Sequence, residues 1–350
     1  MSVLPAASQR VHNQRRTLVV LSALVFLALL ALGAAGLAGS VPVPVADLPQ
    51  AFASLVAGEP DGMSGTLLDL RLGRASSAFA TGAALALAGV MMQALVRNPL
   101  ADPYVLGVSA GAAVGALAAL MFGAALWMVD LGALAGAVGI SLLLYLLARR
   151  DLAGGRGAAR TGESGVLLLT GVVLASACMA LVTLMLSVAP ESRLRGMVFW
   201  MIGDLAGSSW RLLPWIVLCG AVLLALRRAR ALNVMALHAD AAVALGIDVA
   251  ALRRFLFLCS GLLTACAVTS GGSIGFVGLV VPHACRYAFG PDHRILLPAA
   301  TLVGGSFLVF ADTLARTVLA PQQLPVGVLT SLIGVPVFLF QLHQLHLRRR

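Results

Sequence analysis

Long apolar stretches alternate with short polar ones along most of the chain, and this pattern predicts a bundle of membrane-spanning helices. An α-helix rises 1.5 Å per residue, so about 20 residues are needed to cross roughly 30 Å of hydrocarbon. Ten stretches are predicted to be spans, at residues 18–37, 71–96, 104–127, 131–147, 164–188, 210–226, 255–269, 275–286, 294–318 and 326–342. The predicted fold is therefore all-α and polytopic, with ten transmembrane helices, several of them short or broken, in a single domain over residues 1–350.

One predicted span, within residues 269–294, is too short and too interrupted to be an ordinary membrane helix. Glycines crowd its beginning and a proline interrupts its middle: Gly271, Gly272, Gly275, Gly278 and Pro282. Only about ten residues, roughly 15 Å of helix, separate Gly275 from the charged Arg286. The backbone groups freed by such a break must bond to neighbouring helices or line a water-filled cavity. We therefore expect this segment inside the bundle, next to a pathway.

The polar segments between the spans predict the connections. Residues 38–65, rich in proline and acidic side chains, form a loop, and two prolines make residues 97–103 a tight turn. Segment 227–254 is predicted to contain a short amphipathic helix from Leu237 to Leu245, which Gly246 ends. In the third span, three glycines at four-residue spacing predict a close contact with another helix, namely Gly107, Gly111 and Gly115.

Composition agrees with a membrane protein and excludes several kinds of chemistry. Hydrophobic residues make up 60% of the chain and charged residues 11%, and the mean hydropathy is +0.98, whereas soluble domains are about 25% charged. The chain contains no lysine, so it lacks the side chain with which a P-loop contacts nucleotide phosphates. If ATP drives this protein, a separate subunit must bind it. The five cysteines stand singly in apolar runs, which is typical of inert core residues.

The distribution of arginine predicts the orientation in the membrane. With an even number of spans both termini lie on one side, and with that side cytoplasmic, 18 of the 24 arginines are cytoplasmic. The exceptions are Arg71, Arg74, Arg193, Arg195, Arg211 and Arg316. This satisfies the positive-inside rule. The net charge of +10 therefore reflects orientation, and nucleic acid is not expected as a partner.

Ionisable residues near the spans have structural explanations. Asp102, Asp292 and Asp312 fall at predicted helix ends, where a carboxylate is expected to cap a helix. His283 is expected to pack in the broken segment and to donate a hydrogen bond to a carbonyl group. His238 and His293 fall in predicted cytoplasmic segments without a second ligand at metal-binding spacing, and no metal site and no catalytic residue are predicted.

Two long stretches match a known family pattern. Residues 71–113 and 271–316, followed by LPVGVLTSLIGVPVF at 324–338, closely resemble the FecCD family of type II ABC-importer permeases. That family includes vitamin B12, haem and iron-siderophore permeases of the bacterial inner membrane. The resemblance implies a homodimer, two cytoplasmic ATPase subunits that bind ATP and Mg, and a periplasmic binding protein that delivers substrate. It also implies that this chain binds no cofactor.

The resemblance implies a role for segment 227–254 in coupling to the ATPase. Leu237, Ala241 and Leu245 would lie on one face of a coupling helix that Gly246 ends, and that face would fill a groove on the partner. A helix lying on the membrane surface is the alternative.

The resemblance also implies a docking surface and a gate. Arg71, Arg74 and Arg316 match arginines that meet acidic side chains of the binding protein in this family, although arginines also anchor helix ends at the membrane surface. Asn98 and Leu100 match the loop that narrows the cytoplasmic mouth of the channel. A turn without a gating role is the alternative.

Five residues are candidates for the translocation path by analogy with the family: Thr170, Ser176, Thr183, Arg193 and Arg195. Ser and Thr in membrane helices commonly bond their own backbone, which is the alternative for the first three. The two arginines favour an anionic chelate, so an iron-siderophore or haem is preferred as substrate, with cobalamin as the alternative. A secondary transporter driven by an ion gradient is less well supported, because the acidic residues cluster at helix ends.

Overall fold

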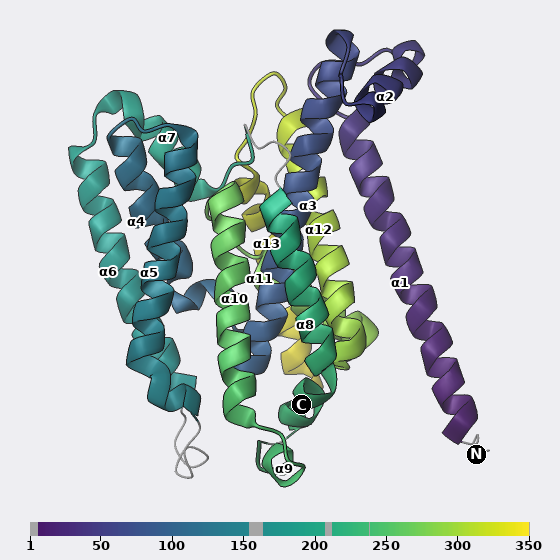
Figure 1. Ribbon diagram of the computed structural model, residues 1–350, viewed down its shortest axis with the longest axis vertical. Helices are drawn as coiled ribbons and strands as arrows, with labels where there is room; N and C mark the ends of the chain where they lie inside the picture. Colours follow the sequence, from purple (N-terminus) through teal and green to yellow (C-terminus); the bar gives the residue numbers. More distant parts are fainter. Residues whose placement is uncertain (1–5, 154–163, 207–211, 238, 350) are drawn as a thin grey trace.

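The computed structural model describes residues 6–153, 164–206, 212–237 and 239–349, and these residues form an all-helical bundle without strands (Figure 1). The helices are α1 (Ala6–Leu37), α2 (Leu48–Ala57), α3 (Gly62–Val96), α4 (Val108–Met121), α5 (Leu126–Ala153), α6 (Ser164–Val188), α7 (Glu191–Ile202), α8 (Leu212–Leu237), α9 (Ala239–Ala244), α10 (Val249–Gly271), α11 (Val277–Phe289), α12 (His293–Thr317) and α13 (Val326–Arg349). Two 3₁₀ turns, η1 (Val45–Asp47) and η2 (Pro103–Leu106), precede α2 and α4.

Each of the ten predicted spans corresponds to a helix, which confirms the predicted fold class. In the described part of the chain, eight helices are long and apolar enough to cross a membrane. The other two, α4 and α11, have 14 and 13 residues. Several helices run further than predicted, since α3 begins at Gly62 instead of Arg71 and α8 continues to Leu237 instead of Leu226. Hydropathy marks where the hydrocarbon ends, but backbone hydrogen bonding continues into water wherever the residues, such as arginine, favour a helix.

Helix α3 is the centre of the bundle. The apolar part of α3 is entirely buried, and α3 packs against α1, α2, α8, α10, α11 and α12. Small residues permit this crowding, because without side chains two helices can approach until their backbones touch. A Cβ on Gly82 would lie 2.3 Å from the carbonyl oxygen of Gly304 in α12, and a Cβ on Gly89 would lie 1.9 Å from that of Gly278 in α11.

The glycines of the third span make the predicted close contact with α5. A Cβ on Gly115 would lie 1.9 Å from the carbonyl oxygen of Gly132, and one on Gly111 would lie 2.6 Å from that of Gly136. Gly107 has a different task, since it adopts φ 76° as the N-cap of α4. A Cβ on Gly107 would still lie 3.3 Å from Gly171 O of α6 and from Ile140 Cγ2 of α5, so all three glycines lie close against another helix, as predicted.

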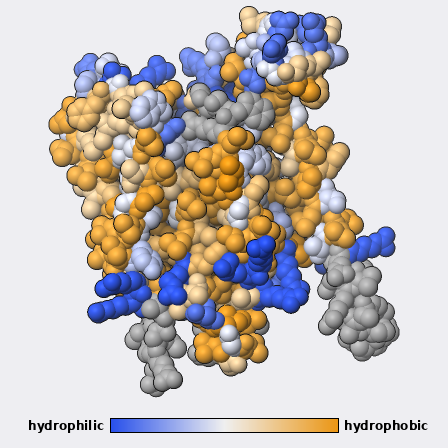
Figure 2. Space-filling model, viewed as in Figure 1, coloured by the Kyte–Doolittle hydropathy of each residue, from blue (hydrophilic) through white to orange (hydrophobic). Residues whose placement is uncertain are grey.

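The two ends of the bundle differ in character. Figure 1 shows α9 and both chain ends at one end, and α2 and α7 at the other. Figure 2 shows hydrophilic residues at both ends, with an apolar belt between them. Exposed arginines are numerous at the α9 end and include Arg149, Arg150, Arg227, Arg230 and Arg254. The positive-inside rule predicts such an enrichment of arginine at one end of a multi-pass protein.

Candidate functional site

The broken segment forms a half-length helix with a backbone break at its start. Helix α11 has 13 residues, about 20 Å, and Phe276 before it adopts φ 68°. Side chains of neighbouring elements bond to the backbone of this segment. Tyr104 Oη donates to Ile274 O at 2.9 Å, and Gln93 Nε2 donates to Leu279 O at 3.3 Å. These bonds tie the segment to η2 and α3, as expected for a broken helix inside the bundle.

A crevice of ≈ 500 Å³ opens beside the break. Its walls come from η2, the end of α7, the break itself and the beginning of α13, and the lining residues are Tyr104, Met201, Ile202, Ser273, Gly275, Gly327, Val328, Ser331 and Leu332. The lining is largely apolar with a few hydroxyl groups. It therefore offers little electrostatic hold on a passing solute, as suits a conduit more than a tight binding site.

Glycines allow close backbone contacts among three of the elements around this crevice. A Cβ on Gly327 of α13 would lie 1.7 Å from Ile202 O, and one on Gly272 would lie 2.3 Å from Trp200 O. Gly327 N–H also donates to Gly203 O at 3.1 Å. The end of α7, the break and the start of α13 are thus in backbone contact, so a displacement of one of them must be followed by the others.

The predicted gate turn stands next to the break but does not line the crevice. Asn98 Oδ1 accepts a hydrogen bond from Leu100 N at 3.0 Å, and both side chains are exposed. Further along the turn, Pro103 packs where a Cβ on Gly278 of α11 would lie, 2.8 Å away. The turn therefore contacts the broken helix through its second half. A gating role for Asn98 and Leu100 stays a prediction.

The three arginines proposed for docking lie at the end of the bundle opposite α9, and they are buried. Their relative exposures are 7% for Arg71, 8% for Arg74 and 5% for Arg316. Arg71 donates from Nη1 to Leu37 O at 3.0 Å and from Nη2 to Val41 O. It therefore holds the end of α1 and the following loop against α3.

Arg74 and Arg316 share one carboxylate, that of Asp312. Arg74 Nη2 donates to Asp312 Oδ1 at 2.7 Å, and Arg316 Nε lies 3.1 Å from Asp312 Oδ2. The Asp312 side chain is 1% exposed. Arg74 Nη1 also donates to Gln323 Oε1 at 2.8 Å, and Arg74 Nη2 lies 4.0 Å from Asp204 Oδ1. The network joins α3, α12, the loop before α13 and the segment after α7.

This cluster keeps an excess of positive charge. Arg74 and Arg316 share the carboxylate of Asp312, Asp204 lies 4.0 Å from Arg74, and the third guanidinium group, that of Arg71, donates to backbone carbonyl groups. An uncompensated positive charge at the end of the bundle attracts acidic partners and steers their approach. However, each guanidinium group already has an internal partner, so direct docking would need it to turn outward. The docking role stays a prediction.

The predicted coupling helix is shorter than expected and does not contain all of its proposed residues. Leu237 is the last residue of α8, and Leu245 and Gly246 lie in the turn after α9, so Ala241 is the only one of the four within α9. The expectation of one helix from 237 to 245 is therefore wrong, because the α8 helix continues through the polar residues before it.

The end of this segment is as predicted. Gly246 adopts φ 77°, its N–H bonds to Val243 O at 3.0 Å, and Ile247 N–H bonds to Ala242 O at 2.9 Å. These two bonds form the Schellman motif that ends helices at glycine. Val243 and Leu245 are 63% and 70% exposed, so an apolar surface remains at the tip.

The proposed path residues on α6 and α7 are exposed but stand apart from the crevice. Thr170, Ser176 and Thr183 each donate to the carbonyl group four residues earlier, at 2.8–2.9 Å, which is the alternative stated for them. Arg193 packs on the turn at Gly123, and Arg195 lies over the ring of Phe199 at 5.4 Å. It is the opposite end of α7 that reaches the crevice, so a path role for these five stays a prediction.

The predictions for the ionisable residues are confirmed in part. Asp102 and Asp292 cap helices as expected, by accepting hydrogen bonds from Tyr104 N at 2.7 Å and Arg294 N at 2.9 Å. The cap predicted for Asp312 is wrong, because its carboxylate is engaged in the arginine network. Buried His283 Nδ1 has no hydrogen-bond partner in the described part of the chain, so the expected bond to a carbonyl is not made through this atom.

Sequence reasoning missed the side chains that hold the break. Tyr104, Ser109 and Gln93 bond to it from three other elements; Ser109 Oγ lies 2.8 Å from Ser273 Oγ. The sequence does contain a signal for such side chains, namely a polar group inside an apolar span, such as the amide of Gln93 in α3. The pairing of Asp312 with Arg316 was also visible as a four-residue spacing on one helix face.

Comparison with known proteins places the chain in a family. The FecCD transport family matches residues 18–344. The chain is 39% identical over 315 residues to the cobalamin import system permease protein BtuC of Halobacterium salinarum, which covers 89% of this chain and 82% of the relative. It is 40% identical over 278 residues to the vitamin B12 import system permease protein BtuC of Escherichia coli O127:H6, which covers 78% and 82%.

Solved structures of similar proteins agree with the family match. A metal-chelate type ABC transporter in an inward-facing conformation matches with a TM-score of 0.79 and 30% identity, over 93% of this chain and 99% of that chain. PsaBC from Streptococcus pneumoniae in complex with Fab shares the fold, with a TM-score of 0.54 at 16% identity. A family match across nearly the whole chain, together with the ten-helix bundle and its broken α11, shows that this protein belongs to the FecCD transport family and is a multi-pass permease of an ABC importer.

Proposed function

We propose that this chain carries cobalamin or a closely related corrinoid across the bacterial inner membrane, with both termini in the cytoplasm. The observation that carries this choice is the identity of 39–40% to permeases named for cobalamin and vitamin B12 import. Arg193 and Arg195 favoured an anionic iron-siderophore or haem. The relatives named for cobalamin and vitamin B12 support the alternative better.

The proposed mechanism is passive within this chain. A large solute would move past the largely apolar crevice at the break, where few polar groups could retain it. The backbone contacts among α7, the break and α13 would let these elements move together between outward-open and inward-open states. The absence of lysine supports an external source of energy, since the chain cannot supply a P-loop.

A separate ATPase is proposed to bind at the α9 end. Exposed Val243 and Leu245 are apolar and stand among arginines, which is a suitable surface for a groove on a partner protein. At the opposite end, the excess positive charge of the arginine cluster would attract a periplasmic binding protein with acidic lobes.

A second copy of the chain is proposed to complete the pathway. In the apolar part of α6 only 22% of the residues are buried, and its exposed face includes Leu169, Val173 and Leu184. The crevice beside α11 is also open on one side. A partner copy would close it and cover part of this apolar surface.

Reconstitution tests this function. The chain, its ATPase and its binding protein are placed in proteoliposomes, and uptake of radiolabelled cobalamin is measured with ATP inside or outside the vesicles and with a proton ionophore. We expect uptake only when ATP reaches the ATPase, unchanged by the ionophore. Uptake that follows the proton gradient without ATP would establish a secondary transporter instead.

Substrate identity has its own test. The binding protein is titrated with cobalamin, haem and a ferric siderophore, and each ligand is then offered to the proteoliposomes. We expect tight binding and transport of the corrinoid. Tight binding of haem or the siderophore, with none of cobalamin, would overturn the choice of substrate while leaving the importer intact.

A further inference from the structure

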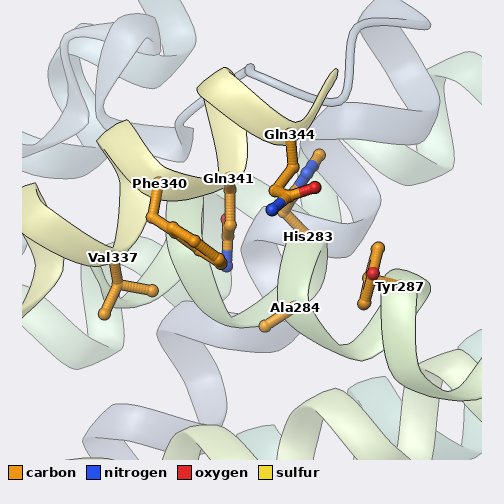
Figure 3. A pocket seen from close by; sticks show the side chains of 7 residues that line it. All are labelled: His283, Ala284, Tyr287, Val337, Phe340, Gln341 and Gln344. Carbon is orange, nitrogen blue, oxygen red and sulfur yellow. The ribbon is translucent and has the colours of Figure 1, made fainter. Parts of the chain in front are cut away.

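A pocket of ≈ 320 Å³ lies between α11 and the second half of α13, away from the crevice at the break. It is lined by His283, Ala284, Tyr287, Val337, Phe340, Gln341 and Gln344. Figure 3 shows His283, Gln341 and Gln344 directed into the same space, with Val337 at one side and Tyr287 at the other. The volume is at the lower end of the range of about 300–1,000 Å³ typical of small-ligand sites.

Two polar atoms of this pocket are buried without partners. His283 Nδ1 and Gln341 Oε1 have no hydrogen-bond partner among the described residues. A buried polar atom left unpaired costs about 1–3 kcal/mol, so native structures rarely retain one unless a ligand or water bonds to it. Both residues line the same pocket, and a small rotation of each side chain would turn its unpaired atom towards one occupant that has a donor and an acceptor.

The position of the pocket narrows the choice of occupant. Tyr287 and Phe340 are 65% and 63% exposed, so aromatic surface is open beside the pocket. Along α13 the lining changes from Val337 to Gln344 as the helix approaches the arginine-rich end, so the apolar part is the deeper part. That gradient is the one a lipid presents, with its acyl chain towards the membrane interior and its head group towards water.

A nearby positive charge also favours a lipid as the occupant. Arg286 lies three residues after His283, in the last turn of α11, next to the pocket but outside its lining. Arginine is the side chain best suited to phosphate, and basic pockets between membrane helices near the cytoplasmic surface bind lipid head groups.

We propose that this pocket binds one phospholipid whose head group carries a hydrogen-bond donor. The phosphate oxygens would accept from Arg286 and from His283 Nδ1 in its protonated tautomer, a hydroxyl or ammonium group of the head would donate to Gln341 Oε1, and an acyl chain would lie along Val337, Ala284 and Phe340. Phosphatidylglycerol and phosphatidylethanolamine meet this requirement. Phosphatidylcholine does not, because its quaternary ammonium group has no N–H.

Brominated lipids test the proposal in the full-length chain. Phe340→Trp puts a fluorescent reporter in the pocket, and the chain is reconstituted in phosphatidylcholine nanodiscs with increasing fractions of brominated phosphatidylglycerol, phosphatidylethanolamine or phosphatidylcholine. Quenching of the unaltered chain, which has four tryptophans, is subtracted. Phe310→Trp is the matched control, since Phe310 of α12 is 55% exposed and lies outside the pocket.

We expect the reporter at 340 to reach half-maximal quenching at a fraction of phosphatidylglycerol or phosphatidylethanolamine about tenfold lower than for phosphatidylcholine, which corresponds to one buried hydrogen bond. The reporter at 310 should show no preference, and adding Gln341→Leu should abolish the preference at 340. Equal quenching by all three lipids at both positions would mean surrounding bulk lipid only and would overturn the proposal.

Two further outcomes also decide whether the lipid proposal holds. If no lipid quenches the reporter at 340, another occupant such as a second copy of the chain covers the pocket, and the proposal fails. If Phe340→Trp does not fold, native mass spectrometry of the unaltered chain gives the answer. There, phosphatidylglycerol or phosphatidylethanolamine should remain bound when phosphatidylcholine is lost, and equal loss of all three would contradict the proposal.

Discussion

Replacing Gly89 by alanine tests the contact on which the broken helix depends. The Cβ of an alanine here would lie 1.9 Å from Gly278 O and 2.7 Å from Gly278 C. The position of a Cβ is fixed by the backbone, so no rotamer relieves the clash. Helices α3 and α11 must separate by about 1 Å or more before the atoms reach an acceptable distance.

The expected cost follows from the structure. Overpacking a tight contact costs about 1–3 kcal/mol, and separating the helices also breaks the bond from Gln93 to Leu279 O, worth about 1 kcal/mol. The higher helix propensity of alanine returns about 1 kcal/mol. The net expectation is a loss of about 1–3 kcal/mol in the free energy of unfolding, from the same principles.

Gly220→Ala provides the matched control. Gly220 lies in α8, and a Cβ there would meet no heavy atom within 4 Å. The control substitution should therefore be neutral or stabilising by up to about 1 kcal/mol. Unfolding of both variants and the unaltered chain is followed by circular dichroism in mixed micelles of increasing sodium dodecyl sulfate fraction. Equal stability of Gly89→Ala and Gly220→Ala would refute the contact between α3 and α11 and the central place of the broken helix.

Three further predictions concern charged and turn residues. Asp312→Asn leaves Arg316 buried without a carboxylate and Arg74 with only the more distant Asp204, and should lower the free energy of unfolding by about 3 kcal/mol in the same micelles; an unchanged value would show that the network is not formed. Burial raises the pKa of Asp102 from 3.8 to about 6, against the opposing bond from Tyr104 N–H, so its ionisation above pH 6 is unfavourable to the fold. The chain should lose at most about 3 kcal/mol of stability as pH rises from 4 to 7, and Asp102→Asn, which keeps the acceptor oxygen, should remove that part of the pH dependence; an identical profile in the variant would contradict this. Gly246→Ala puts a side chain at φ 77°, which costs about 1 kcal/mol, and should reduce ATPase stimulation by the binding protein in proteoliposomes; full stimulation would argue against a coupling role for the turn after α9.

The residues of each segment, taken by themselves, determined the class of fold. Transfer of a helix into lipid depends on the sum of its own side chains, so the ten spans and the orientation of the arginines follow from composition segment by segment. The broken segment was visible for the same reason, since Gly271, Gly272 and Pro282 weaken a helix wherever they stand. The stop at Gly246 needed only the backbone freedom of one residue.

Tertiary structure alone decided which segments meet and where helices end in water. Arg74 and Asp312 are 238 residues apart, and nothing in either neighbourhood specifies the other, so arginines predicted to face outward proved to be buried in a network. The extension of α8 to Leu237 displaced the predicted coupling helix, because hydropathy registers the membrane boundary but not the continuation of backbone hydrogen bonds beyond it. Packing is a property of pairs of surfaces, and only the assembled bundle brings Gly89 against Gly278 or leaves His283 facing an open pocket.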